Sequence, residues 1–179
     1  DLKYPGIEVR LHSANSQHII ERLLDCELDV ALVEGQVVDD RVEARPWLEE
    51  EMVVVAASDP VPEALGKPAP FSEQLWIVRE RGSGSREATE RLLTRLGNDL
   101  PRTLEVGSNE AIVQTVAAGC GLGLVPKVCA QDQLALGRVR IVPLINDPIL
   151  RRLYRVRLPH RPTSHAALAF EALLADTTR

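Results

Sequence analysis

The segment from Trp76 to Arg91, WIVRERGSGSREATER, determines how the rest of the chain is interpreted. It continues an apolar run that begins at Leu75 and is typical of a buried strand. Residues 82–85, with the sequence GSGS, then give the backbone freedom before a helix expected from residue 86 onward. Because the first amides of a helix lack backbone partners, this loop can hold an anion. A turn followed by a helix cap, with Ser83 or Ser85 as the N-cap, accounts for the same residues.

The same order of strand, small polar residues and helix start recurs on both sides of this segment. Upstream, residues 7–11 (IEVRL) alternate like a strand, a helix follows with Asn15 or Ser13 as its N-cap, and residues 28–33 form a nearly apolar strand. Downstream, residues 104–106 form a short strand before the next polar helix start. Ligands of open α/β sheets bind at the carboxyl ends of strands, so these polar starts are candidate binding positions.

Strands and helices alternate through the remainder of the chain. Residues 49–51 (EEE) are expected to form a solvated turn, and the proline-rich residues 58–70 a surface connection. The basic residues between 151 and 157 favour a solvated face or a subunit contact over nucleic-acid binding. An α/β architecture with parallel sheets is predicted. Its further strands are expected at 42–46, 51–57, 122–126, 139–144 and 151–158, and its further helices at 86–96, 110–118, 127–136 and 164–175.

Composition excludes several classes of protein. The 179 residues, 45% of them apolar, are enough for one domain or two small lobes. The net charge of −5 and the scattered basic residues lack the electrostatic footprint of a nucleic-acid binder. Three cysteines without CxxC spacing favour a reducing, cytoplasmic compartment. No signal peptide or long apolar run indicates export or a membrane partner, with the reservation that a leader can have been removed.

Neither a metal, a cofactor nor catalysis is expected from the side chains of this sequence. The four histidines form no ligand pair on one helix face, and His160 and His165 lie on either side of Pro162. No Ser/His/Asp order and no pair of carboxylates in a shared cleft position stands out. The sequence therefore favours a binding function over an enzyme.

Taken in order, the motifs of the chain resemble the effector-binding domain of LysR-type transcriptional regulators. The resemblance extends over essentially the whole chain. It is seen in PGIEV at 5–9, LDVAL at 28–32, RERGSGSR at 79–86, SNEAI at 108–112, AAGCGLGLVP at 117–126, RLY at 152–154 and ALAF at 167–170.

The resemblance implies a fold like that of type-2 periplasmic binding proteins, in which two Rossmann-like lobes face each other across a ligand cleft and two strands form the hinge. Lobe I is expected over residues 1–72 plus 149–179, and lobe II over 73–148. The resemblance also implies that the family's N-terminal winged helix-turn-helix is absent from this chain, together with the first strand and most of the first helix of lobe I. Such domains are expected to form homodimers, and tetramers in the full-length protein, which reaches DNA only through the missing N-terminal domain.

The resemblance also places residues in the effector site. Ser13, Asn15 and Ser16 are expected to line the cleft from lobe I, Ser83, Gly84, Ser85 and Arg86 from lobe II, and Ser108, Asn109 and Glu34 as second-rank candidates. Helix starts on both sides of one cleft favour a small carboxylate or oxyanion effector. Glu34 would repel an anion unless it binds a cation or an amine on the ligand. A solute-binding protein of a transport system, with the same fold, is the alternative function.

Overall fold

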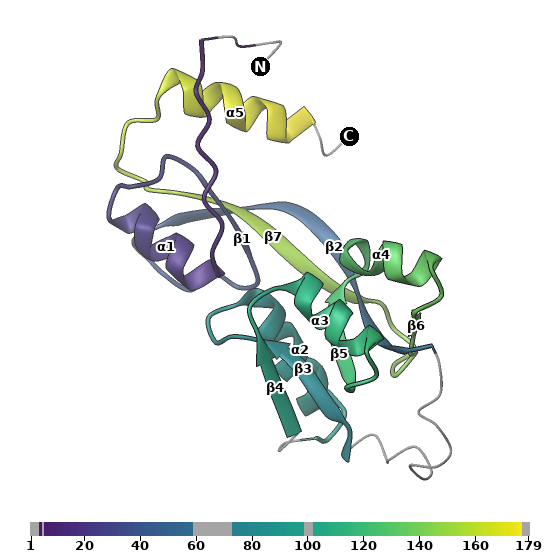
Figure 1. Cartoon of the computed structure of the whole chain (residues 1–179). Coiled ribbons are helices and arrows are strands. Elements are labelled where there is room, and N and C mark those ends of the chain that lie inside the picture. The colour runs from purple at the N-terminus through teal and green to yellow at the C-terminus, as the bar shows by residue number, and fades with distance from the viewer. Residues whose placement is uncertain (1–3, 5, 59–72, 99–101, 177–179) are drawn as a thin grey trace.

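Two long strands join the two ends of the molecule in the computed structural model (Figure 1). The structure describes residues 4, 6–58, 73–98 and 102–176. Strands β2 (Glu43–Ala57) and β7 (Ile149–Arg157) pair antiparallel along most of their length. At one end of the pair lie α1 (Ser16–Leu24), β1 (Ala31–Glu34) and α5 (His165–Asp176). At the other lie β3 (Leu75–Arg79), α2 (Gly84–Arg95), β4 (Arg102–Val106), α3 (Asn109–Ala117), β5 (Leu122–Pro126), α4 (Lys127–Ala135) and β6 (Val139–Ile141).

The strands form one mixed sheet, so the prediction of parallel sheets is only partly correct. The strand order is β1-β7-β2-β5-β3-β4, and β6 pairs with β2. β3 pairs parallel with β4 and with β5. β2 and β7 run antiparallel to every strand that they pair with among the described residues. The α/β class with two lobes and a two-strand connection is confirmed, and the connecting strands are β2 and β7.

Helices cover both faces of the β2–β5–β3 part of the sheet. Met52 and Val54 of β2 lie in a core with α2, whereas Val53 and Val55 lie in a core with α3 and α4. Gly123 allows α3 to approach β5 closely, because a Cβ there would lie 2.3 Å from Ile112 Cγ2. Because successive residues of these strands face opposite helix layers and both layers exclude water, nearly every residue of the strands is apolar.

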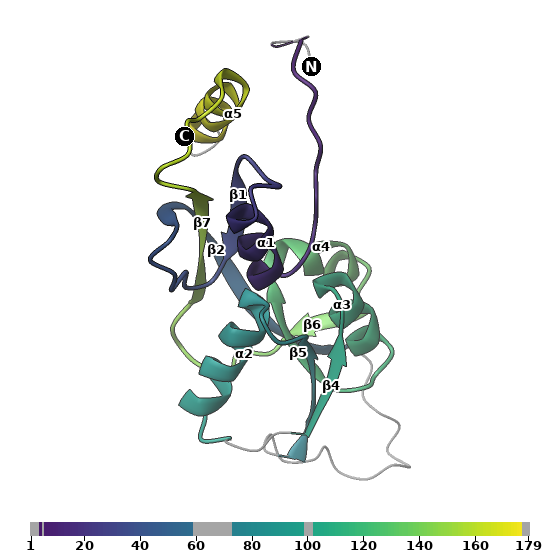
Figure 2. The ribbon, with the colours of Figure 1, turned by 90° about the vertical axis from the view of Figure 1, so that its left-hand side faces the viewer.

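The other end of the molecule has a smaller core. Leu23 of α1 packs with Val33 of β1 and Val156 of β7. The C-terminal helix is connected to β2 by Trp47, whose Nε1 donates a hydrogen bond to the Leu174 carbonyl oxygen at 3.1 Å. Figure 2 shows α5 at this end, away from α2 and α3. Within the described residues, none of the helices has the length and the apolar composition needed to cross a bilayer.

Capping side chains account for three helix starts, and those of Asn15 and Ser83 are among the predicted caps. The side chains of Asn15, Ser83 and Ser108 are the N-caps of α1, α2 and α3, and each accepts a hydrogen bond from a first-turn amide at 3.0–3.3 Å. The helices expected at 127–136 and 164–175 are confirmed within about one residue at each end. The loop of residues 82–85 is shorter than predicted, since α2 already begins at Gly84.

Two of the predictions are wrong for a shared reason. Residues 7–11 form no strand, and β1 pairs with β7 alone within the described part of the chain. Residues 49–51 form no turn but lie inside β2, where their carboxylates pair with basic side chains of β7 and α4. In both cases the outcome depends on a distant pairing partner, which local sequence does not specify. Most of the proline-rich connection, from residue 59 onward, lies outside the described residues.

Candidate functional site

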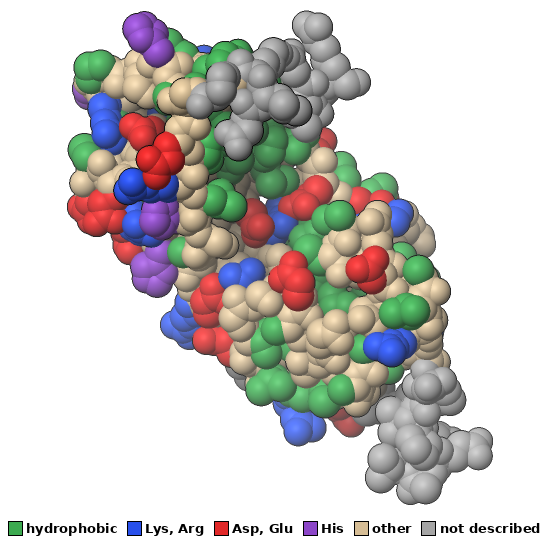
Figure 3. Space-filling model, turned by 45° about the horizontal axis from the view of Figure 1, so that its top comes forward, with side chains coloured by type: hydrophobic (Ala, Val, Ile, Leu, Met, Phe, Trp, Pro, Cys, Tyr) green, Lys and Arg blue, Asp and Glu red, His purple; other side chains and the backbone are tan. Residues whose placement is uncertain are grey.

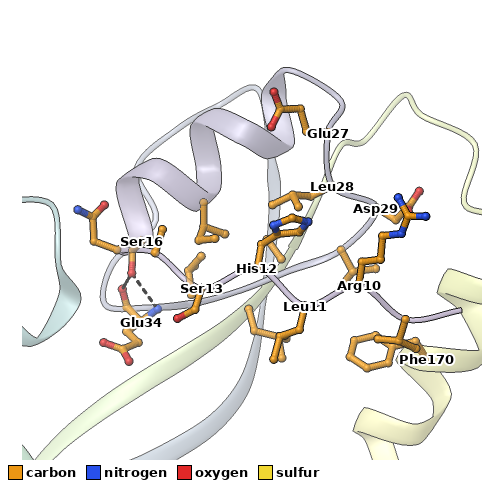
Figure 4. A pocket seen from close by; sticks show the side chains of 18 of the residues that line it. Arg10, Leu11, His12, Ser13, Ser16, Glu27, Leu28, Asp29, Glu34 and Phe170 are labelled. Carbon is orange, nitrogen blue, oxygen red and sulfur yellow. Dashed lines mark hydrogen bonds between the residues drawn. The ribbon is translucent and has the colours of Figure 1, made fainter. Parts of the chain in front are cut away.

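A cavity of about 840 Å³ opens between the two ends of the molecule. Its walls are the extended residues 7–14, the strand β1 with the residues before it, and the first turns of α5. Its floor is formed by the ends of β3 and β4 and by the starts of α1, α2 and α3. Figure 3 shows this hollow between the two halves, with acidic and basic side chains around it. In Figure 4, Ser13, Ser16 and Glu34 lie at one end of the pocket, and Arg10, Asp29 and Phe170 at the other.

The floor contains all three N-capping side chains described above. Asn15, Ser83 and Ser108 line the cavity, and each marks the start of a helix. Helix starts carry partial positive charge, so their convergence on one cavity favours a negatively charged ligand group. Asn109, the residue after one of these caps, is 8% exposed, and its side-chain oxygen has no hydrogen-bond partner within the described structure. That acceptor is available to a donor on a ligand.

Most of the acidic side chains that line the cavity are neutralised by arginines. Arg79 donates two hydrogen bonds of 2.8 Å to the Glu80 carboxylate, and they hold the pKa of Glu80 below its ordinary value. Of the six carboxylates that line the cavity, five have an arginine partner. These pairs are Glu8–Arg10, Glu27–Arg22, Asp29–Arg161, Glu34–Arg151 and Glu80–Arg79. The sixth carboxylate, Glu110, lies in the first turn of α3.

Behind Glu34, on the side away from the cavity, lies Arg151, the one buried charged side chain among the described residues, at 2% exposure. Its Nε and Nη2 donate to the Glu50 carboxylate, with an Nε distance of 2.7 Å. Its Nη1 donates to Glu34 Oε2 and, at 2.6 Å, to the hydroxyl of Ser85, which itself lies 3.4 Å from the same carboxylate oxygen. The cluster therefore links β1, β2 and β7 to the first turn of α2.

The contact between β1 and α2 is close because Gly84 has no side chain. A Cβ at Gly84 would lie 2.4 Å from the Glu34 carbonyl oxygen. Ser16 also fixes the backbone of Glu34, because its hydroxyl donates to the carbonyl oxygen at 3.0 Å and accepts from the amide at 3.2 Å. A backbone hydrogen bond of 3.2 Å from the Gln17 amide to the Gly82 carbonyl adds a second contact between the two halves.

The structure brings seven of the ten predicted site residues to the wall of one cavity. They are Ser13, Asn15, Ser16, Glu34, Ser83, Ser108 and Asn109. The other three, Gly84, Ser85 and Arg86, lie behind the wall. Ser85 is held by Arg151, and the guanidinium of Arg86 binds Glu90 Oε1 at 2.6 Å and the Arg79 carbonyl oxygen at 3.0 Å.

Sequence reasoning missed Arg79, Glu80, Glu50 and Arg151. The first two lie in the motif RERGSGSR at 79–86, of which only the second half, residues 83–86, is predicted to form part of the site. Glu50 falls in the predicted solvated turn and Arg151 in the basic strand predicted to form a solvated face or a subunit contact, because nothing local indicates that one arginine of that strand is buried. No group of three or more histidine, cysteine or acidic side chains suited to a metal ion occurs in the described residues.

Comparison with known proteins gives a consistent picture. The family model for the LysR substrate binding domain matches residues 2–179. The Escherichia coli K12 protein called "Uncharacterized HTH-type transcriptional regulator YeiE" is 32% identical over 171 residues, which cover 93% of this chain and 57% of that protein. The regulator CbbR of Sinorhizobium medicae is 32% identical over 176 residues, 97% of this chain and 56% of that protein. The chain thus spans little more than half the length of these relatives.

Solved structures agree with the sequence relatives. The regulatory domain of Synechocystis PCC6803 CcmR, solved in complex with 2-PG, superposes with a TM-score of 0.83 and 32% identity, over 99% of this chain and 86% of that chain. The effector-binding domain of QuiR, solved with shikimate, has a TM-score of 0.74 and 23% identity, over 92% of this chain and 78% of that chain. The second likeness shows the fold alone.

Proposed function

Because the chain belongs to the LysR substrate-binding domain family, we propose that it is the ligand-sensing part of a transcriptional regulator and binds a small-molecule effector in the cavity between its two halves. The effector shifts the population of arrangements of the two halves, and a DNA-binding part of the full-length protein responds. The names of the relatives support this function over a solute-binding protein of a transport system.

The observation that supports the cavity as the site is the convergence of three helix starts on its floor. Asn15, Ser83 and Ser108 cap three different helices and line the same hollow. An anionic group there gains from the helix dipoles and the first-turn amides. The arginine partners of five lining carboxylates reduce the repulsion that the anion would otherwise meet. We therefore propose a carboxylate or oxyanion effector, and the 2-PG bound to the CcmR domain supports a small ligand.

Other properties of the whole protein remain proposals. The division into lobe I (1–72 plus 149–179) and lobe II (73–148) is supported by β2 and β7, which connect the two ends. The homodimer, the tetramer of the full-length protein and the cytoplasmic location follow from the family resemblance. A binding role without catalysis is supported by the regulators among the relatives.

A thermal-shift screen tests the proposed function. The chain is heated with 2-PG, small organic acids and inorganic oxyanions, and the screen is repeated with Asn15→Ala and Ser108→Ala. A ligand at a hundredfold excess over its Kd stabilises the native state by about 2.7 kcal/mol, which for a chain of this size raises Tm by about 5–11 °C. We expect at least one anion to stabilise the parent and to lose its effect in both variants.

Ser164→Ala is the matched control for these two variants. Ser164 also lines the cavity, and its hydroxyl accepts from the Ala167 amide at 3.1 Å, but it lies at the start of α5, away from the floor. The variant removes a capping hydroxyl of the same kind and should leave the ligand effect intact. A screen in which no anion stabilises the parent, or in which all three variants respond alike, would contradict the proposed site.

A further inference from the structure

The side chain of Glu34 separates the cavity from a buried cation. Glu34 lines the cavity and is bonded to Arg151 and Ser85, whereas neither of those two residues lines it. Arg151 is 2% exposed and the Glu34 side chain 31%. An anion that reached Arg151 from the cavity would therefore arrive where the Glu34 carboxylate now lies.

We propose that the Glu34 carboxylate is an internal competitor of the anionic effector: it fills the position offered by Arg151 Nη1 and the Ser85 hydroxyl, and the anionic group of the effector displaces it. This inference rests on the proposed function, because it concerns how the same cavity is regulated. It explains why Ser85, a residue predicted to bind effector, is buried behind the cavity wall in this structure.

The division of donors on Arg151 makes such an exchange possible. Nε and Nη2 are both bonded to Glu50, which does not line the cavity. When Glu34 leaves, Arg151 keeps one carboxylate partner, so its buried charge is never without a counter-charge. Nη1 and the Ser85 hydroxyl then become two neighbouring donors for one oxyanion, and charge-assisted hydrogen bonds of this kind are the stronger ones in proteins.

The attachment of Glu34 allows its side chain to leave while its backbone stays. Ser16 holds the amide and the carbonyl of Glu34 through one hydroxyl, so the end of β1 is fixed independently of the carboxylate. The carboxylate bonds to Ser85 in the first turn of α2, at the contact between the two halves. Exchange of Glu34 for a ligand oxyanion therefore replaces a direct contact between β1 and α2 by one through the ligand.

Sulfate binding to the 179-residue chain tests this inference without knowledge of the natural effector. Titration calorimetry with sodium sulfate at constant ionic strength compares the parent with Glu34→Gln and Glu50→Gln. Each variant removes one negative charge and one carboxylate partner of Arg151, but only Glu34→Gln replaces the competing carboxylate between Arg151, Ser85 and the cavity by a neutral amide that an anion displaces more easily. We expect Glu34→Gln to bind sulfate at least tenfold more tightly than the parent, and Glu50→Gln to stay within threefold of it.

Equal sulfate affinity of the parent and Glu34→Gln would overturn the inference. An equal gain in both variants would also overturn it, because the gain would then come from net charge alone. If circular dichroism shows that Glu34→Gln does not fold, Glu34→Asp decides instead. The aspartate keeps the negative charge, but its side chain is one methylene shorter and reaches Arg151 less well. We expect Glu34→Asp to bind sulfate at least threefold more tightly than the parent, and an unchanged affinity would overturn the inference.

The two proposals can fail separately. If the sulfate affinities do not differ while organic acids still stabilise the parent in the Asn15- and Ser108-dependent way, Glu34 is no competitor and the proposed function stands. Suppose instead that Glu34→Gln gains sulfate binding, but that no anion in the thermal-shift screen depends on Asn15 and Ser108. The role of Glu34 as a competitor is then supported, and the location proposed for the effector is wrong.

Discussion

Arg151 and Arg152 are neighbours on β7, and each pairs with a glutamate directly opposite on β2, yet they belong to different environments. Arg151 is buried and binds Glu50, Glu34 and Ser85. Arg152 is 63% exposed and binds Glu49 at 2.6 Å. Successive residues of a strand point to opposite faces, so the same pair of strands presents one ion pair to the helices and one to water.

The difference shows what an ion pair can do in this fold. On the exposed face, Arg152–Glu49 and Lys127–Glu51 lie along the connecting strands and are screened by solvent and salt. On the covered face, a single arginine connects three strands to α2. The same kind of arginine–glutamate ion pair therefore supports the pairing of β2 with β7 on one face and joins the two halves of the molecule on the other.

Arg151→Met should have the largest effect on stability. It leaves Glu34 and Glu50 without their shared cation, and removal of one partner of a buried ion pair typically costs about 3–5 kcal/mol. Both carboxylates are partly exposed, so we expect about 3 kcal/mol, which lowers Tm by about 6–12 °C. Urea denaturation followed by circular dichroism measures the change. A loss below about 1 kcal/mol would show that the buried pair contributes no more than a surface pair.

Gly84→Ala should have the next largest effect, since it attacks the same contact sterically. The added Cβ would meet the backbone of Glu34 at 2.4 Å, and backbone cannot move aside as a side-chain tip can. Overpacking of this kind costs about 1–3 kcal/mol. The matched control is Gly97→Ala: this glycine follows the same helix and has open space where its Cβ would lie, although its φ of +70° adds backbone strain. Urea denaturation of both variants tests this assignment. If the β1–α2 contact is tight, Gly84→Ala is the more destabilised of the two, and an equal or smaller loss in Gly84→Ala would contradict it.

Arg152→Met is the counterpart of the first variant on the exposed face. Exposed ion pairs contribute about 0–1 kcal/mol, so the same substitution one residue further along should lower stability by less than about 1 kcal/mol. The difference in unfolding free energy between the parent and Arg152→Met should become smaller still in high salt, which screens exposed charges. A loss as large as that of Arg151→Met would remove the distinction between the two faces.

The titration of Glu43 probes the weakest effect, at the ion pair between β2 and β7 farthest from Arg151. Hydrogen bonds from Arg157 and then from Arg45 lower the pKa of Glu43 below its ordinary value of 4.5. A carboxyl whose pKa is lowered on folding stabilises the folded state above its unfolded pKa, and that contribution is lost as the pH falls through the folded value. Carboxyl chemical shifts followed by NMR should place the pKa of Glu43 below 4.5, and Arg157→Gln should raise it. An unchanged pKa in the variant would mean that Arg157 does not bind Glu43 in solution.

Local signals predicted the helices and the covered strands well. The caps Asn15, Ser83 and Ser108 act on amides two or three residues away, so a short stretch of sequence contains both partners of each interaction. The apolar runs of β3 and β5 are buried on both faces, which leaves little ambiguity about their environment. These features also placed the polar helix starts that now line the cavity floor.

The connecting strands could not be predicted in the same way. Glu50 and Arg151 stand 101 positions apart, and only the fold brings them together. Residues 49–51 resemble a solvated turn until three basic side chains are placed opposite them. Residues 7–11 have the alternation of a strand but pair with no strand among the described residues. Alternation indicates that a segment can form a strand, and a neighbouring strand decides whether it does.

The most direct test of the account is a double-mutant cycle between Ser85 of α2 and Arg151 of β7. Urea denaturation measures the free energy of unfolding for the parent, Ser85→Ala, Arg151→Met and the double variant. The account predicts a coupling of at least about 1 kcal/mol, since residues that share a hydrogen-bond network are typically coupled by about 0.5–3 kcal/mol. Effects that add within about 0.3 kcal/mol would contradict it, because they would show that the buried arginine does not join the connecting strands to α2.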